Sequence, residues 1–123
     1  MPHRLLILDD DAMICKTMEN IAQFIGFDTQ YTTNPEVFLR QTKEWQPDLI
    51  ALDLIMPNMD GIQVLNNLAH QDCQSRILIT SGLNPRILDA AQRAALAHGL
   101  DIAGILPKPF TAVKLREVLL EMV

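Results

Sequence analysis

The sequence has few of the features that mark secreted, zinc-binding or membrane proteins. It contains two cysteines, Cys15 and Cys73, which are far apart and form no C-x-x-C pair. Reduced thiols are therefore the default expectation, and with them a cytoplasmic location. The three histidines, His3, His70 and His98, show no ligand spacing in the sequence. No zinc site is predicted from them.

Long apolar runs and clustered positive charge are also absent. No run approaches the roughly 20 apolar residues that span a bilayer, and residues 1–25 lack the layout of a secretory signal. Ten Lys and Arg residues are scattered against 15 Asp and Glu, for a net charge of −5. We therefore expect no membrane insertion and no direct contact with nucleic acid. With 123 residues, 49% of them hydrophobic, we expect a single domain over 1–123.

What the sequence does contain is a regular alternation of apolar runs and helix-like segments. Such alternation predicts an α/β fold, with a parallel sheet between two layers of helices. Runs that are apolar throughout, such as Leu5–Leu8, indicate strands buried on both faces. The predicted strands are 4–8, 27–31, 49–52, 76–80 and 102–106, and the five predicted helices are 14–25, 35–45, 61–69, 85–98 and 113–122.

Local signals set the helix ends. Asn34 and Asn84 each precede a proline, a combination that predicts an N-cap followed by the first helical residue. Asp60, before Gly61, predicts the start of the third helix. Gly99 predicts the end of the fourth helix, since glycine readily adopts the left-handed conformation found there.

Polar residues follow four of the predicted strands. The carboxyl ends of parallel strands line one crevice, so these side chains are expected to converge there. Asp11 is interpreted as a helix cap, the usual role of a lone aspartate after a strand. The residues at the strand ends are Asp9, Asp10 and Asp11 after the first strand, Asp53 after the third, Thr80 at the fourth and Lys108 after the fifth.

Such a set of side chains suits phosphoryl transfer. Asp53 is the candidate acceptor, since a carboxylate can take a phosphoryl group as an acyl phosphate. Mg²⁺ or Mn²⁺ would neutralise the phosphoryl oxygens, with Asp10 and Asp53 as direct ligands and Asp9 acting through water. A backbone carbonyl after Asp53 completes the predicted metal shell. Thr80 supplies a hydroxyl donor and Lys108 a point charge.

The segment Asp53-Leu-Ile-Met-Pro-Asn-Met-Asp60-Gly61 resembles the response-regulator receiver domains of two-component signalling. Leu8-Asp9-Asp10-Asp11, Thr80-Ser81 and Lys108-Pro109-Phe110 extend the resemblance over the whole chain. It implies a flavodoxin-like, doubly wound, five-stranded sheet in the order 2-1-3-4-5. It also implies phosphorylation of Asp53 by a sensor histidine kinase or phosphotransfer protein, metal binding by the main-chain carbonyl of Ile55, and a cis Lys108–Pro109 bond.

The sequence departs from the receiver pattern at several positions. Ile105 stands where receivers commonly have Tyr or Phe, so the aromatic part of their switch is missing. Ile55 and Gly82 stand where polar side chains help to place water, which predicts slow loss of the phosphoryl group. A long interval between Thr80 and Lys108 predicts a long fourth helix. Parts of the sequence also resemble, more weakly, receivers attached to cyclic-di-GMP phosphodiesterase domains.

The leading interpretation is a phosphorylation-controlled signalling receiver that acts on no metabolic substrate and is not an enzyme. The face made by the fourth helix, fifth strand and fifth helix would control a target protein or fused output domain, or form a homodimer. Ile105 favours an alternative, a phosphate-independent interaction module. A haloacid-dehalogenase-type phosphatase needs a second aspartate two residues after the nucleophile, where this chain has Ile55. Whether the chain stands alone or begins a larger regulator is left open.

Overall fold

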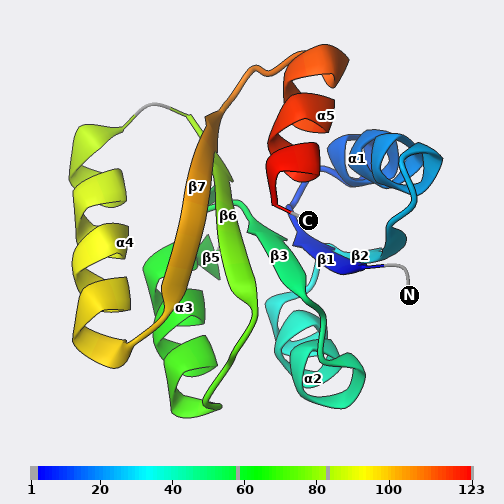
Figure 1. Ribbon diagram of the computed structural model, residues 1–123. Helices are drawn as coiled ribbons and strands as arrows, with labels where there is room; N and C mark the ends of the chain where they lie inside the picture. Colours follow the sequence, from blue (N-terminus) through cyan, green and yellow to red (C-terminus); the bar gives the residue numbers. More distant parts are fainter. Residues whose placement is uncertain (1–2, 58, 83, 123) are drawn as a thin grey trace.

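The computed structural model describes residues 3–57, 59–82 and 84–122, which fold around one parallel sheet (Figure 1). Its strands are β1 (Arg4–Leu8), β2 (Asp28–Thr32), β3 (Leu49–Leu52), β6 (Arg76–Ser81) and β7 (Asp101–Pro107). They lie side by side in the order β2-β1-β3-β6-β7, and every neighbouring pair is parallel. Numbered along the chain, these five strands have the order 2-1-3-4-5, which confirms the predicted topology.

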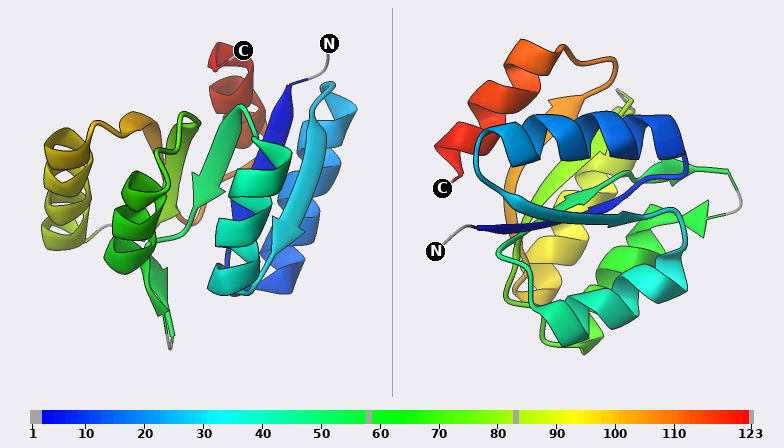
Figure 2. Two further views of the ribbon diagram at one scale, coloured as in Figure 1. Left: turned by 90° about the horizontal axis from the view of Figure 1, so that it is seen from below. Right: turned by 90° about the vertical axis from the view of Figure 1, so that its right-hand side faces the viewer.

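Helices cover both faces of the sheet (Figures 1 and 2). They are α1 (Ala12–Phe24), α2 (Pro35–Trp45), α3 (Gly61–His70), α4 (Pro85–His98) and α5 (Ala112–Glu121). The residues of α1 and α5 pack on one face, and those of α2, α3 and α4 pack on the other. The predicted three-layer, doubly wound architecture is confirmed.

The three central strands, β1, β3 and β6, are buried on both faces because side chains alternate between the two helix layers. Leu6 and Leu8 contribute to the cluster that contains Phe38 of α2. Leu5 and Ile7 contribute to the cluster on the α1 and α5 side. All four strand residues are at most 1% exposed. Burying each such side chain contributes about 1.5–3 kcal/mol, so the continuous apolar runs largely fix which segments form the sheet.

Side chains cap the helices where the sequence predicts caps. The Asn34 side chain accepts hydrogen bonds from the backbone at the start of α2, and Asn84 does the same for α4. Asp60 caps α3 in the same way. Asp11 Oδ1 accepts from Met13 N–H at 2.9 Å, which confirms its interpretation as the cap of α1. These caps orient the helices that follow the strand ends.

Two features were not predicted. A short antiparallel hairpin of β4 (Ile55–Met56) and β5 (Met59–Asp60) extends beyond the end of β3. The register between β6 and β7 also shifts between Ile77 and Leu78, which marks a bulge in the edge strand β7. Among the described residues, none of the helices has the length and apolar character needed to cross a membrane.

Candidate functional site

Three of the predicted site residues follow one row of side chains across the sheet. Leu52 of β3 lies opposite Leu8 of β1 and Ile79 of β6. The next residues along these strands are Asp9, Asp53 and Thr80, so they end three neighbouring strands at the same level. All three are at most 2% exposed. The structure therefore brings together side chains that are far apart in the sequence.

Lys108, which directly follows β7, ties two of these residues together. Its Nζ donates to Asp9 Oδ2 at 2.5 Å and to Asp53 Oδ2 at 2.9 Å. Its backbone N–H donates to the carbonyl of Ser81 at 2.8 Å, which fixes the lysine to the end of β6. The peptide bond between Lys108 and Pro109 is cis, as predicted.

The carboxylates are also oriented by backbone donors. Asp53 Oδ1 accepts from the N–H of Ile55 at 3.0 Å, and Asp9 Oδ1 accepts from the N–H of Asp11 at 3.0 Å. Asp10 is exposed to solvent at the edge of the group. Carboxylate oxygens of Asp9, Asp10 and Asp53 lie within 4.8 Å of one another. The result is a half-buried acidic pocket with one open side.

Burial dominates the electrostatics of this pocket. Burial raises the pKa of Asp9 above its ordinary value, and the hydrogen bond from Lys108 only partly offsets that effect. Repulsion from Asp53 raises it further but is a smaller cause. For Lys108, burial by itself lowers the pKa, but hydrogen bonds to Asp9 and Asp53 outweigh it and raise the pKa.

The donor set fits a hard divalent cation. Mg²⁺ prefers one or two carboxylates with water and phosphate oxygens, and all three candidate side chains are carboxylates. Two oxygens bound to one Mg²⁺ at about 2.1 Å lie at most about 4.2 Å apart. Small rotations of the side chains would bring the carboxylate oxygens, now within 4.8 Å of one another, to this distance. Lys108 is the positive charge already present, and a bound cation would share Asp9 and Asp53 with it.

The other two predicted residues lie around this pocket. Thr80 is buried at the end of β6. Ile55 begins the hairpin, pairs with Asp60, and leaves its own side chain 43% exposed. No polar side chain therefore extends from position 55 beside Asp53. The roles of the Thr80 hydroxyl and the Ile55 carbonyl stay predictions.

Two neighbouring side chains were missed by the sequence reasoning. The hydroxyl of Ser81 is buried and has no hydrogen-bond partner among the described residues. The thiol of Cys15 donates to the carbonyl of Asp9 at 3.5 Å, and burial raises its pKa to about 12. In the sequence, the position of Ser81 next to Thr80 was the only sign that Ser81 lies at the site. Cys15 falls on the apolar face of α1, which predicts burial but not this contact.

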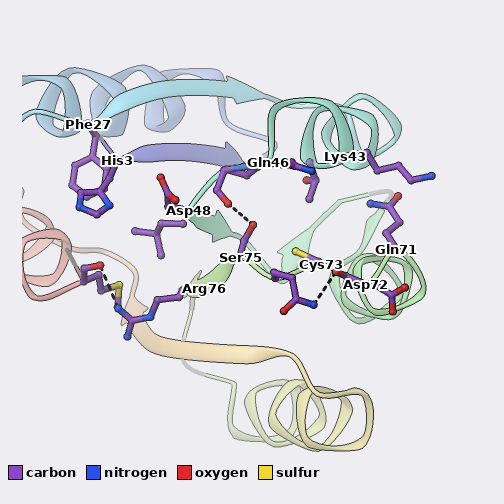
Figure 3. A pocket seen from close by; sticks show the side chains of 15 residues that line it. His3, Phe27, Lys43, Gln46, Asp48, Gln71, Asp72, Cys73, Ser75 and Arg76 are labelled. Atoms are coloured by element: carbon purple, nitrogen blue, oxygen red, sulfur yellow. Dashed lines mark hydrogen bonds between the residues drawn. The ribbon is translucent and has the colours of Figure 1, made fainter. Parts of the chain in front are cut away.

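A separate cavity of about 770 Å³ lies at the opposite, amino end of the strands (Figure 3). None of the predicted site residues lines it. Two of its polar side chains are engaged within the protein, since Ser75 Oγ donates to the carbonyl of Pro47 at 2.6 Å and Arg76 Nη1 to that of Met122 at 3.3 Å. The converging carboxylates, not the more spacious cavity, mark the candidate site.

The chain is similar to known signalling proteins. Residues 5–120 match the model of the family described as the response regulator receiver domain. The chain is 32% identical over 122 residues to the chemotaxis protein CheY of Bacillus subtilis, covering 97% of this chain and 96% of that protein. It is 30% identical over 115 residues to the response regulator MprA of Mycolicibacterium vanbaalenii, covering 94% of this chain but 48% of that protein.

Solved structures show the same fold. A response regulator from Colwellia psychrerythraea has a TM-score of 0.82 at 30% identity, with 99% of this chain and 98% of that chain covered. A receiver domain from Bermanella marisrubri has a TM-score of 0.85 at 24% identity, with 99% and 98% covered. The family match over most of the length, joined to the acidic pocket and its lysine, leads to one conclusion. The chain belongs to the response regulator receiver domain family.

Proposed function

We propose that this receiver is a signalling switch in which Asp53 accepts a phosphoryl group from a histidine kinase or phosphotransfer protein. The observation that carries the proposal is the contact of Lys108 Nζ with both Asp53 and Asp9. Phosphoryl transfer depends mainly on positioning and charge neutralisation, and the pocket provides a placed carboxylate and a placed cation. We propose a cytoplasmic location, where such donors are found.

The proposed reaction moves one phosphoryl group. A carboxylate oxygen of Asp53 attacks phosphorus, an O–P bond forms, and the N–P bond of the donor's phosphohistidine breaks. The leaving imidazole keeps the bonding electrons and takes a proton from solvent. Lys108 then faces the new phosphoryl oxygens, and Thr80 donates its hydroxyl to one of them. Asp10 and Asp53 directly, Asp9 through water and the Ile55 carbonyl would hold Mg²⁺, which would supply neutralisation of the charge on these oxygens.

The surface beside Lys108 supports a docking place for the donor. We define the α1 groove as the hollow of about 450 Å³ lined by Met13, Ile14, Thr17, Lys108, Pro109 and Phe110. Met13 is 80% exposed there, which is unusual for a large apolar side chain. Because Lys108 contacts Asp53, a protein seated in the groove holds its phosphohistidine next to the acceptor. An apolar helix surface of the donor is the proposed occupant.

Output is proposed to pass through α4, β7 and α5. Thr80 is the last residue but one of β6, and the connection to α4 begins after Ser81, so movement of Thr80 toward a phosphoryl group displaces the start of α4. Ile105 of β7 packs against the same cluster as Ile87 and Leu88 of α4 and has no ring to rotate. The response is therefore proposed to centre on α4, with a target protein, a fused output domain or a second copy as the recipient. The link to a phosphodiesterase domain stays a prediction.

The first test is intact mass after incubation with phosphoramidate, with and without Mg²⁺. We expect a Mg²⁺-dependent gain of one phosphoryl group in the wild type and none in Asp53→Asn. Asp11→Asn is the matched control, since asparagine caps helices as well as aspartate, and it should react like the wild type. If the wild type gains nothing under any condition, the phosphate-independent interaction module is the better account.

The docking surface needs a separate test. Met13→Lys should slow transfer from a phosphorylated histidine kinase but leave the reaction with phosphoramidate unchanged, because the small donor needs no groove. Leu96→Lys, at an 85% exposed position on α4, is the control and should affect neither. Equal slowing by both variants, or none by Met13→Lys, would count against the α1 groove.

A further inference from the structure

Two histidines that are distant in the sequence meet at one end of the fold. His70 is the last residue of α3 and His98 is the last residue of α4. Their ring centres lie 6.4 Å apart, with the ring planes inclined at 47°. Both residues are exposed to solvent. The pair lies at the edge opposite the phosphoryl site, where α3 and α4 run side by side and end (Figure 1).

We propose that His70 and His98 form a binding site for a divalent transition-metal ion of the zinc class, which ties the end of α4 to α3. Imidazole nitrogen is a preferred ligand of Zn²⁺, Ni²⁺ and Cu²⁺, whereas Mg²⁺ prefers oxygen. With metal–nitrogen bonds of about 2.0–2.1 Å, two imidazoles that share one tetrahedral ion lie roughly 5 Å apart between ring centres. The observed separation of 6.4 Å is larger by about 1 Å, and rotation of the two exposed side chains would close this difference.

The surroundings of the pair also favour a cation. Each helix ends with the negative end of its dipole, although the last carbonyls of α3 already accept hydrogen bonds from the backbone N–H groups of residues 71–73. Here two such ends converge, and a histidine stands in the last turn of each. The dipoles add to the attraction that the two ring nitrogens provide. No acidic side chain is needed to make this junction attractive to a positive ion.

The site has two protein ligands, with water completing the shell. Among the described residues, the only group of three or more His, Cys, Asp or Glu side chains close enough to share an ion is Asp9, Asp10 and Asp53. The histidine pair has imidazole ligands and lies at the other end of the fold, so it is chemically and spatially distinct from the acidic pocket. Binding there does not depend on phosphorylation of Asp53, so the two proposals can fail separately.

Isothermal titration with Zn²⁺, in buffer containing saturating Mg²⁺ to fill the acidic pocket, tests the proposal. We expect one Zn²⁺ per chain, with binding lost in His70→Gln and in His98→Gln. His3→Gln is the matched control and should bind like the wild type. His98→Cys should keep binding, because a thiolate also ligates Zn²⁺. These residues are exposed, so the variants should fold, which thermal melting checks.

Three outcomes would overturn the site. They are no Zn²⁺ binding by the wild type, binding unchanged in both glutamine variants, and equal loss in His3→Gln. NMR provides a second measurement. If the site exists, Zn²⁺ shifts the signals of residues near the ends of α3 and α4 and leaves the signals of residues around Asp53 unchanged. Phosphoramidate labelling of the same preparation reports on the phosphoryl site independently.

Discussion

Lys108 Nζ lies 2.9 Å from Asp53 Oδ2, although the two residues are 55 positions apart in the sequence. The same ammonium also bonds Asp9. Before any phosphoryl group arrives, the lysine therefore offsets part of the negative charge of the candidate acceptor and its buried neighbour. The stability of the fold and the proposed phosphoryl transfer therefore both depend on the Lys108 ammonium. Measurements on mutants can separate its contribution to each.

Lys108→Met should lower the free energy of unfolding in the absence of metal by about 2–3 kcal/mol, because two buried carboxylates lose their partner. Mg²⁺ should restore part of this loss, since it takes over the same neutralisation. Urea unfolding with and without Mg²⁺ measures both effects. Lys114→Met, at an exposed position of α5, should change stability by less than about 0.5 kcal/mol. A stable metal-free Lys108→Met protein would show that the ion pair contributes little.

The raised pKa of Asp9 makes a second prediction. The folded state holds this proton more tightly than the unfolded chain, whose carboxyl has the ordinary pKa of 3.8. The contribution of Asp9 to stability is therefore favourable below that pH and is lost as pH rises from 3.8 through the raised pKa. At neutral pH the buried charge costs stability. Asp9→Asn should remove that cost and stabilise the metal-free protein by on the order of 1 kcal/mol.

Thermal melting against pH, with and without Mg²⁺, checks this effect. Asp9→Asn should melt higher than the wild type at neutral pH without metal and should gain less from Mg²⁺. The exposed Asp10 is the control, since Asp10→Asn should alter metal-free stability little while still weakening the response to Mg²⁺. If Asp9→Asn melts lower than the wild type, the ion pair with Lys108 outweighs the cost of burial.

Much of this fold could be predicted because its signals are local or nearly so. Apolar runs identified four of the five main strands, the exception being the mostly polar β2, and Asn-Pro pairs identified the starts of α2 and α4. The site followed from topology, since parallel strands deliver Asp9, Asp53 and Thr80 to one edge. Each of these inferences needs only residue type and order along the chain.

The features that were missed depend on three-dimensional contacts. The β4–β5 hairpin has two residues in each strand, too few for a periodic pattern. The proximity of His70 and His98 depends on where two separate helices end. The main cause of the raised pKa of Asp9 is burial, which the sequence of an acidic cluster does not reveal. All three features are determined by how the folded chain packs, not by its amino-acid composition.

Gly61 provides a sharper test of that packing. A Cβ atom at this position would lie 2.5 Å from Leu54 Cα and 2.6 Å from the Leu54 carbonyl oxygen. Backbone cannot yield as a side chain can, so Gly61→Ala should destabilise the protein by about 2–3 kcal/mol and disturb the loop after Asp53. Phosphoramidate labelling of Asp53 should slow as well.

Gly104→Ala is the matched comparison for Gly61→Ala. A Cβ atom there would lie 2.8 Å from Met122 Cε, the end of a flexible side chain that can move aside. Its cost should stay below about 1 kcal/mol, with normal labelling of Asp53. Urea unfolding of the two variants decides the matter. Equal costs would mean that the backbone near Leu54 adjusts as readily as a methionine side chain.

The last prediction concerns how long the phosphoryl group stays on Asp53. Hydrolysis needs a water placed for attack, and neither the apolar Ile55 nor Gly82 has a side chain that can hydrogen-bond it. Ile55→Asn adds an amide at the pocket edge, where the present side chain is 43% exposed and has room to change. We expect the lifetime to shorten on the order of tenfold, about 1.4 kcal/mol of activation free energy. Ile55→Val, which stays apolar, should keep the slow rate. Intact mass followed over time after removal of phosphoramidate gives both lifetimes, and a longer lifetime in Ile55→Asn would rule out this explanation.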